Sequence, residues 1–138
     1  MRYKKKDGAI AAIFNDGDDP IRELNRIAEE SGSNLSIISA VGMIENPELG
    51  FFNGKSYERK IFRGCFELLA YSGTIVKGAE EYAAHIHAMI GDHKHNVYGG
   101  HLFSGKVKLM HEIVLEILPM EFTKTKSDSQ TGLMLWDL

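Results

Sequence analysis

A stretch of alternating side chains near the C-terminal end constrains the fold of this chain more than any other feature. Between Lys106 and Leu118, every second residue is apolar except for one histidine, His111. Successive side chains of a β-strand point to opposite faces of the sheet, so this alternation is typical of a strand that buries one face. We therefore expect a long strand here, with His111 as a core or interface residue on its largely apolar face.

Shorter strand candidates fill most of the remaining chain. They are apolar or alternating, and glycine, proline or asparagine residues separate them. The expected strands are 8–14, 35–44, 49–52, 57–63, 64–72, 85–90, 98–103 and 133–138. Asn46-Pro47-Glu48 is expected to be a turn, and Asn53-Gly54 is a typical hairpin turn.

One segment has helical spacing instead. Its apolar residues recur at intervals of three or four, at Ile21, Leu24, Ile27 and Ala28. Asp18 or Asp19 can cap the start of this helix, Pro20 suits its first position, and Gly32 suits its end. One helix among about seven or eight strands predicts an α+β fold, in which a mainly antiparallel, curled sheet packs against the helix.

The composition agrees with a single globular domain spanning residues 1–138. With 43% hydrophobic residues and a formal net charge of −3, the chain is too apolar and too weakly charged to be disordered. No apolar run approaches the roughly 20 residues of a membrane-spanning helix, so no membrane association is expected. Residues 1–6 are basic but lack the apolar region of a signal peptide, and the single Cys65 can form no intrachain disulfide. These features favour a cytoplasmic location.

Histidine gives the strongest chemical signal of the sequence. His85 and His87 are two residues apart, so in a strand they point to the same face. If the polar stretch 92–96 is a hairpin loop centred on Lys94, His87 lies directly opposite His101. Three imidazoles then converge on one point, as a bound zinc ion or another transition metal requires.

Other interpretations of these residues stay open. A His-X-His pair is commonly two half-buried strand residues, and a register shift of one residue would send His101 to the other face. His93 and His95 are expected in an exposed loop, and Cys65 is expected to be a small buried residue. Glu67 is either a general base near such a metal or a solvated or ion-paired side chain.

Several segments taken together resemble the plant and prokaryote conserved (PPC) domain. The matching segments are Asp16-Gly17-Asp18, Ser39-Ala40-Val41-Gly42, Leu49-Gly50-Phe51-Phe52, residues 64–73, His85-Ile86-His87, and Gly99-Gly100-His101-Leu102 with Gly105. The resemblance covers residues 8–137 and is most specific in the two histidine segments. It implies an α+β fold, a homotrimer, and a cluster of His85, His87 and His101 that is able to hold a metal.

The resemblance to plant members of that family is incomplete. Plant members join the domain to Arg-Gly-Arg-Pro hook segments that contact the minor groove of DNA, and this sequence contains no such hook. Cys65 also stands where plant members carry arginine. The basic residues that could contact DNA are Arg2, Lys4, Lys5, Lys6, Lys124 and Lys126. The negative net charge gives DNA binding no support.

Two functions are compatible with this sequence. The first is a homotrimeric, metal-binding module with a regulatory role through DNA or protein partners. The second is a metal-dependent small-molecule enzyme of hydrolase or lyase type, in which a metal at His85, His87 and His101 activates water or polarises a carbonyl. A concave pocket with a carboxylate beside the histidines would favour the enzyme.

Overall fold

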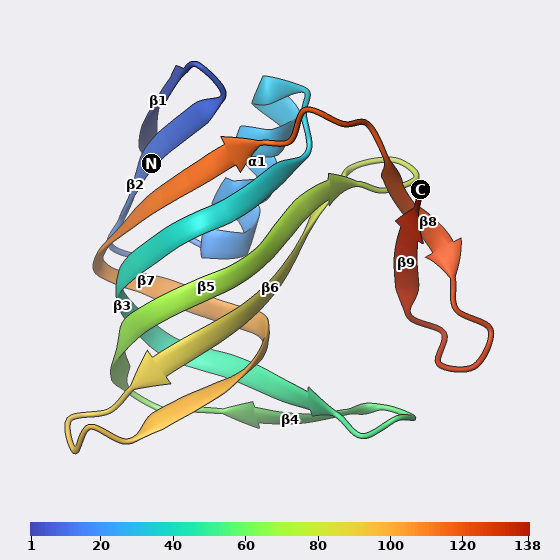
Figure 1. The fold of residues 1–138 in the computed structure, drawn as a ribbon. Coiled ribbons are helices and arrows are strands. Elements are labelled where there is room, and N and C mark those ends of the chain that lie inside the picture. Colours follow the sequence, from blue (N-terminus) through green and yellow to red (C-terminus); the bar gives the residue numbers. More distant parts are fainter.

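The computed structural model describes all residues 1–138 and contains one helix and nine strands. The elements in chain order are β1 (Arg2–Lys6), β2 (Ala9–Asn15), α1 (Pro20–Ser31), β3 (Leu35–Phe52), β4 (Tyr57–Ile61), β5 (Cys65–Lys77), β6 (Tyr82–Gly91), β7 (Val97–Ile117), β8 (Thr123–Ser127) and β9 (Met134–Asp137). Seven strands form one antiparallel sheet in the order β1-β2-β7-β6-β5-β3-β4 (Figure 1). The predicted α+β architecture is therefore confirmed.

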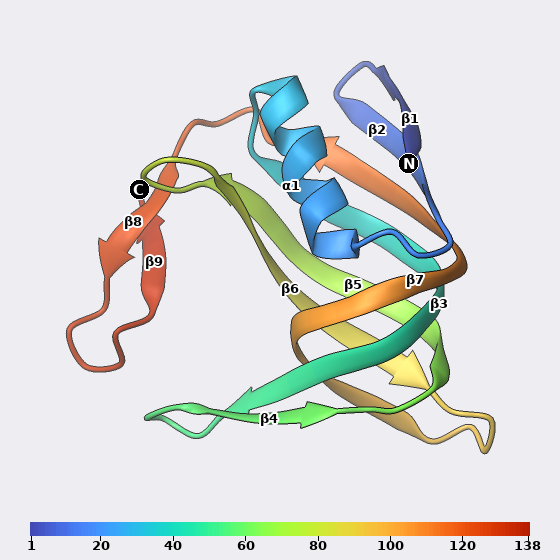
Figure 2. The ribbon, with the colours of Figure 1, turned by 180° about the vertical axis from the view of Figure 1, so that it is seen from behind.

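The sheet curls until it closes on itself. β7 pairs with β6 near its start and with β2 near its end, and it also pairs with β3 along most of its length. The strands β7, β6, β5 and β3 thus form a closed circuit. α1 contacts β5, β6 and β7 and packs over this curled sheet (Figure 2). Its buried Leu24, Ile27 and Ala28 join the hydrophobic core that the inner faces of the strands contribute.

α1 begins and ends at the residues that the sequence predicts. The Asp19 carboxylate accepts a hydrogen bond from the backbone N–H of Arg22, and Pro20 occupies the first helical turn. Gly32 ends the helix in the left-handed conformation, and its N–H bonds to the last turn. These caps satisfy backbone groups that no intrahelical partner can reach.

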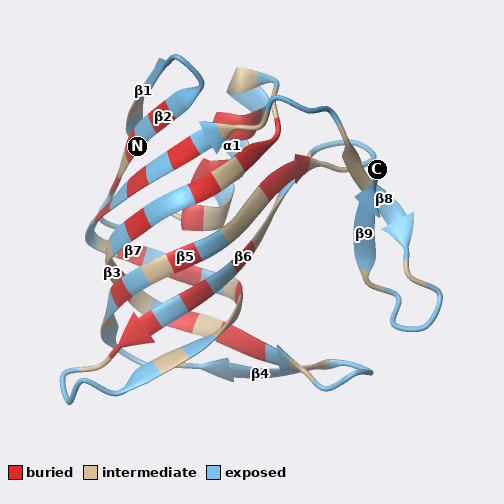
Figure 3. Ribbon diagram, viewed as in Figure 1, coloured by how far each residue is buried: buried red, intermediate tan, exposed pale blue.

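The long alternating strand is confirmed, with one local correction at Leu109. On β3, Met43 is opposite Lys108 and Gly42 is opposite His111, so Leu109 and Met110 form a bulge of two extra residues. Leu109 has a φ of 61° and its side chain is 67% exposed instead of buried. Because two residues are inserted, the alternation resumes in phase, and buried and exposed residues continue to alternate along β7 beyond the bulge (Figure 3).

The turn that we expected at residues 46–48 is absent, and a second bulge takes its place. β3 runs through this segment as one strand of 18 residues, and the register shifts between Glu45 and Glu48. Asn46 has a φ of 47°, and its side-chain carbonyl accepts a hydrogen bond from the N–H of Gly64. The polar residues and Pro47 therefore make a bulge that bends β3 and does not end it.

Both ends of the chain differ from expectation. The basic N-terminal residues form the edge strand β1, which pairs with β2. The C-terminal segment forms a strand, as predicted, but β9 pairs only with β8, in a hairpin that projects from the seven-stranded sheet (Figure 1). We call residues 120–138 the C-terminal arm. No helix in the structure has both the length and the apolar character that crossing a membrane requires.

His111 is a buried, neutral core residue, as its position on the apolar face predicts. Its side chain is fully buried, and its Nε2 donates to the carbonyl of Met43 at 3.0 Å. The ring packs edge-on against Tyr71, and Nδ1 has no hydrogen-bond partner. Burial disfavours the charged form and lowers the pKa of His111 to about 4.

This lowered pKa predicts a loss of stability in mild acid. In the unfolded chain His111 binds a proton near pH 6.5, whereas in the folded chain it binds one only near pH 4. The folded state therefore keeps its full stability above pH 6.5 and loses stability as the pH falls toward 4. Between pH 7 and pH 5 we expect the titration of His111 to lower the free energy of unfolding by about 2 kcal/mol. Urea unfolding of the wild type and of His111→Leu at both pH values measures this contribution. An equal pH dependence in the two proteins would contradict it.

Candidate metal centre

Two adjacent strands bring the three predicted histidines together. His85 and His87 lie on the same face of β6, and His101 on β7 is directly opposite His87. The hairpin loop Asp92–Asn96 that joins these strands is closed by the Asp92 carboxylate, which accepts hydrogen bonds from the N–H groups of Lys94 and Asn96. The register that the loop predicts is therefore present.

The three imidazoles face one another closely. One ring nitrogen from each histidine lies within 4.8 Å of the others, and the ring centroids are 5.1, 5.4 and 5.7 Å apart. Tetrahedral zinc requires nitrogens about 3.3 Å apart, so small side-chain rotations would bring the set to bonding distance. Nδ1 of His101 is buried without a hydrogen-bond partner. A buried polar atom without a partner is costly, and a metal ion would satisfy it in the tautomer that has its lone pair on Nδ1.

The surroundings of the cluster favour neutral imidazoles, which are the form that binds a metal. Burial, together with the neighbouring His85 and His87, lowers the pKa of His101 to about 4. Burial also lowers the pKa of His85, with smaller effects from Lys124 and His87. At neutral pH both rings are therefore neutral, which is the form that a transition metal requires, so the residues present fit such a metal.

Aromatic side chains hold His101 in place. Its ring packs against Tyr57 of β4 and Phe103 of β7, at centroid distances of 5.1 and 4.6 Å, and these two rings also contact each other at 5.0 Å. The Arg59 guanidinium lies 3.9 Å above the Phe103 ring and forms a two-bond ion pair with Glu48. Sequence reasoning missed these residues. The only indication in the sequence was Phe103, which lies two residues beyond His101 and therefore on the same face of the strand.

The C-terminal arm adds a residue that the sequence did not assign to the site. The Lys124 Nζ of β8 lies 3.0 Å from Nδ1 of His85. Lys124 is partly buried, and this burial lowers its pKa. Its part in the site depends on how the arm folds back on β5, and no local sequence pattern encodes that contact.

The remaining candidates lie outside the cluster. Glu67 is exposed on β5, directly opposite Gly91 of β6. Gly91 lies four residues beyond His87, so at the usual rise of a strand Glu67 is about 13 Å along the sheet from His87. His93 and His95 are exposed in the hairpin loop, as expected. The expectation that Cys65 is buried is wrong, because it lies exposed at the start of β5. The cluster thus consists of histidines without a carboxylate.

Comparisons with known proteins agree with the fold. A family model described as the Plants and Prokaryotes Conserved (PCC) domain matches residues 1–119. A plant- and prokaryote-conserved protein from Pyrococcus horikoshii has a TM-score of 0.83 at 22% identity, with 99% of this chain and 94% of that chain covered. At this identity the likeness supports the fold. A comparison with curated proteins found no match.

Two further solved structures are more similar in sequence. The metal-containing protein AF0104 from Archaeoglobus fulgidus is 29% identical, with a TM-score of 0.84 and coverage of 99% of this chain and 97% of that chain. A protein from Bacteroides thetaiotaomicron named "putative DNA binding protein" is 27% identical, with a TM-score of 0.87 and coverage of 99% and 96%.

Proposed function

Because the chain belongs to the Plants and Prokaryotes Conserved (PCC) domain family, we propose that it is a metal-binding module that assembles as a homotrimer and acts through binding partners. The observation that carries the proposal is the convergence of His85, His87 and His101 from two paired strands. Three imidazole ligands favour zinc, with other transition metals as alternatives. The likeness to the metal-containing Archaeoglobus protein supports the same assignment.

Metal analysis tests this proposal directly. Protein purified without a histidine tag should contain one zinc ion per chain by mass spectrometric metal analysis, and His87→Ala should contain less than a tenth of that amount. His93→Ala is the matched control, because His93 lies in the exposed loop of the same hairpin. Equal metal content in the two variants would overturn the assignment.

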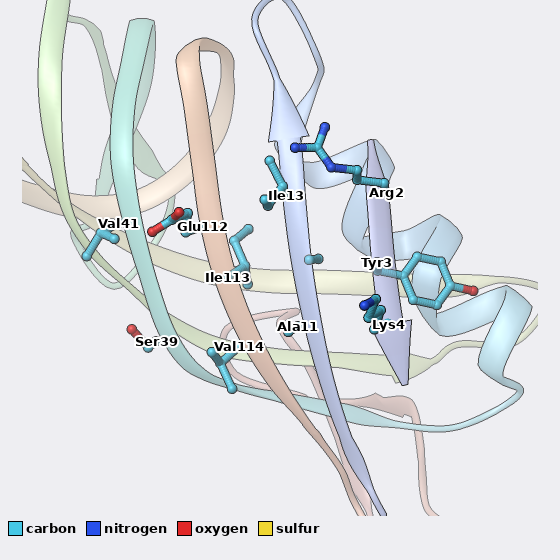
Figure 4. Close-up of a pocket in the computed structure, with 11 residues that line it drawn as sticks. Arg2, Tyr3, Lys4, Ala11, Ile13, Ser39, Val41, Glu112, Ile113 and Val114 are labelled. Atoms are coloured by element: carbon cyan, nitrogen blue, oxygen red, sulfur yellow. The ribbon is translucent and has the colours of Figure 1, made fainter. Parts of the chain in front are cut away.

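An apolar groove on the outer face of the sheet supports self-assembly. The groove has a volume of about 630 Å³, and Ile13, Val41 and Val114 line it from three neighbouring strands (Figure 4). Val41 and Val114 are exposed apolar side chains, at 45% and 41%. Arg2 and Glu112 on the groove give it charges of both signs, which suits contact with a second copy of itself. Light scattering of the untagged protein should give three times the mass of the chain.

DNA is a further partner that the proposal includes. It has support from the name of the Bacteroides relative and from β1, an edge strand that carries Arg2, Lys4, Lys5 and Lys6. Lysines on an edge strand also prevent unwanted strand pairing, so they do not by themselves indicate a ligand. A gel shift at physiological ionic strength tests the role, and no shift at micromolar protein would remove DNA from the proposal.

The alternative function is a metal-dependent enzyme of hydrolase or lyase type at the same histidines. A metal there would act as a Lewis acid or activate water. Three pockets of the surface are lined by other residues, and Glu67 lies too far along the sheet to serve the cluster as a base. These observations favour the binding module.

A further inference from the structure

The contact between Lys124 and His85 fixes the hydrogen-bonding state of this histidine. A lysine ammonium can only donate, so at 3.0 Å the Nδ1 of His85 must accept. A neutral imidazole carries one hydrogen, which then resides on Nε2. In this arrangement His85 has no free lone pair for a metal.

Metal binding at His85 is therefore incompatible with this contact. If a metal took the lone pair of Nδ1, it would displace the ammonium from its acceptor. If a metal took Nε2, the remaining hydrogen would move to Nδ1, and two donors would then face each other. In both cases Lys124 must leave His85.

Lys124 forms no ion pair with a carboxylate in the structure, and its polar contact is with the imidazole of His85. The ammonium of Lys124 lies 3.0 Å from Nδ1 of His85, and its side chain is partly buried there. The cluster itself contains no acidic side chain, and the nearby Arg59 is already paired with Glu48. A dipositive metal beside this partly buried ammonium would thus concentrate positive charge at a cluster that contains no acidic side chain, which is unfavourable unless an anion enters.

We propose that Lys124 makes the histidine cluster an oxyanion-dependent metal site, in which a small carboxylate or similar oxyanion is held by the displaced Lys124 ammonium beside the metal. This inference rests on the metal binding proposed above. Three histidines leave a coordination position open, and Lys124 lies on the arm side of the cluster. By linkage, the oxyanion should raise the affinity for the metal, and the metal should raise the affinity for the oxyanion by the same factor.

Titration with Co²⁺, followed by visible absorption, tests the inference with acetate as the probe. Metal-stripped, untagged wild type should bind Co²⁺ about tenfold more tightly in saturating acetate than in its absence. In Lys124→Gln the effect of acetate should fall below twofold. This variant should also bind Co²⁺ more tightly than the wild type without acetate, because no ammonium competes for His85. Lys126→Gln is the matched control, since Lys126 lies on the same strand and is exposed.

The outcomes separate this inference from the proposed function. If Co²⁺ does not bind to the wild type, metal binding itself fails. If Co²⁺ binds but acetate acts equally on wild type and Lys124→Gln, or on neither, the role of Lys124 is overturned and the metal site stands. Circular dichroism of the metal-free variant checks its fold, and Lys124→Met provides a second substitution without a hydrogen-bonding group.

Discussion

Removal of the metal with a chelator is expected to destabilise the wild-type protein and to leave His87→Ala unchanged. A ligand that binds only the folded state adds RT ln(1 + [L]/Kd) to the free energy of unfolding, or about 4 kcal/mol when free metal exceeds Kd a thousandfold. For a domain of this size, that corresponds to a fall in Tm on the order of 10 °C. The triad joins only β6 and β7, so the metal acts as a crosslink between the two strands of this hairpin.

Differential scanning calorimetry with and without chelator measures this effect. His93→Ala should behave like the wild type, because its imidazole lies in the exposed loop of the same hairpin. His101→Ala should behave like His87→Ala and should also lose the contacts of its ring with Tyr57 and Phe103. An equal fall in Tm in wild type and His87→Ala would assign the chelator effect to another site.

The histidine triad could be predicted because two local rules determine it. Alternation along a strand places His85 and His87 on one face, and a short polar loop leaves little freedom for the register of the hairpin. Neither rule depends on the rest of the fold. The caps of α1 could be predicted for the same reason, since Asp19 and Gly32 act on backbone groups within one turn of the helix.

The bulges could not be predicted from the alternating pattern. At Leu109, an insertion of two residues leaves the alternation intact, so the sequence before and after the bulge looks like one regular strand. What holds the bulge is a distant partner, because the Asp16 carboxylate accepts a hydrogen bond from the Leu109 N–H. At Asn46, turn-forming residues are incorporated into a strand because neighbouring strands supply their hydrogen bonds.

The residues around the triad were missed because tertiary structure brings them there. Tyr57 reaches His101 only because β4 folds back along β3, and Lys124 reaches His85 only because the C-terminal arm returns to β5. Both contacts join segments far apart in the sequence. A lysine in a polar tail is typical of a solvated side chain, and nothing local distinguishes Lys124 from Lys126.

Gly73→Ala is expected to disrupt both the fold and the metal centre. Gly73 lies on β5 opposite Ile86 with a φ of 150°, which side chains rarely tolerate. A Cβ at this position would overlap the carbonyl oxygen of His85 and approach the Ile86 Cα at 3.1 Å. Backbone strain and overpacking together should cost about 3 to 5 kcal/mol, a large share of the stability of a typical domain. Relief of the overlap requires β6 to shift at His85.

Gly64→Ala is the matched control that separates backbone strain from overpacking as causes of the lost stability. Gly64 also has a positive φ, of 104°, but a Cβ there would have no heavy atom within 4 Å, so its substitution carries the backbone strain alone, about 1 kcal/mol. Urea unfolding should be followed by far-UV circular dichroism, because the single Trp136 lies exposed on the C-terminal arm and does not report on the core. Metal content measured on the same samples should fall in Gly73→Ala and stay unchanged in Gly64→Ala. If Gly73→Ala were no less stable than Gly64→Ala, β5 and β6 would have room to separate at this point, and the position of His85 would not depend on their close approach.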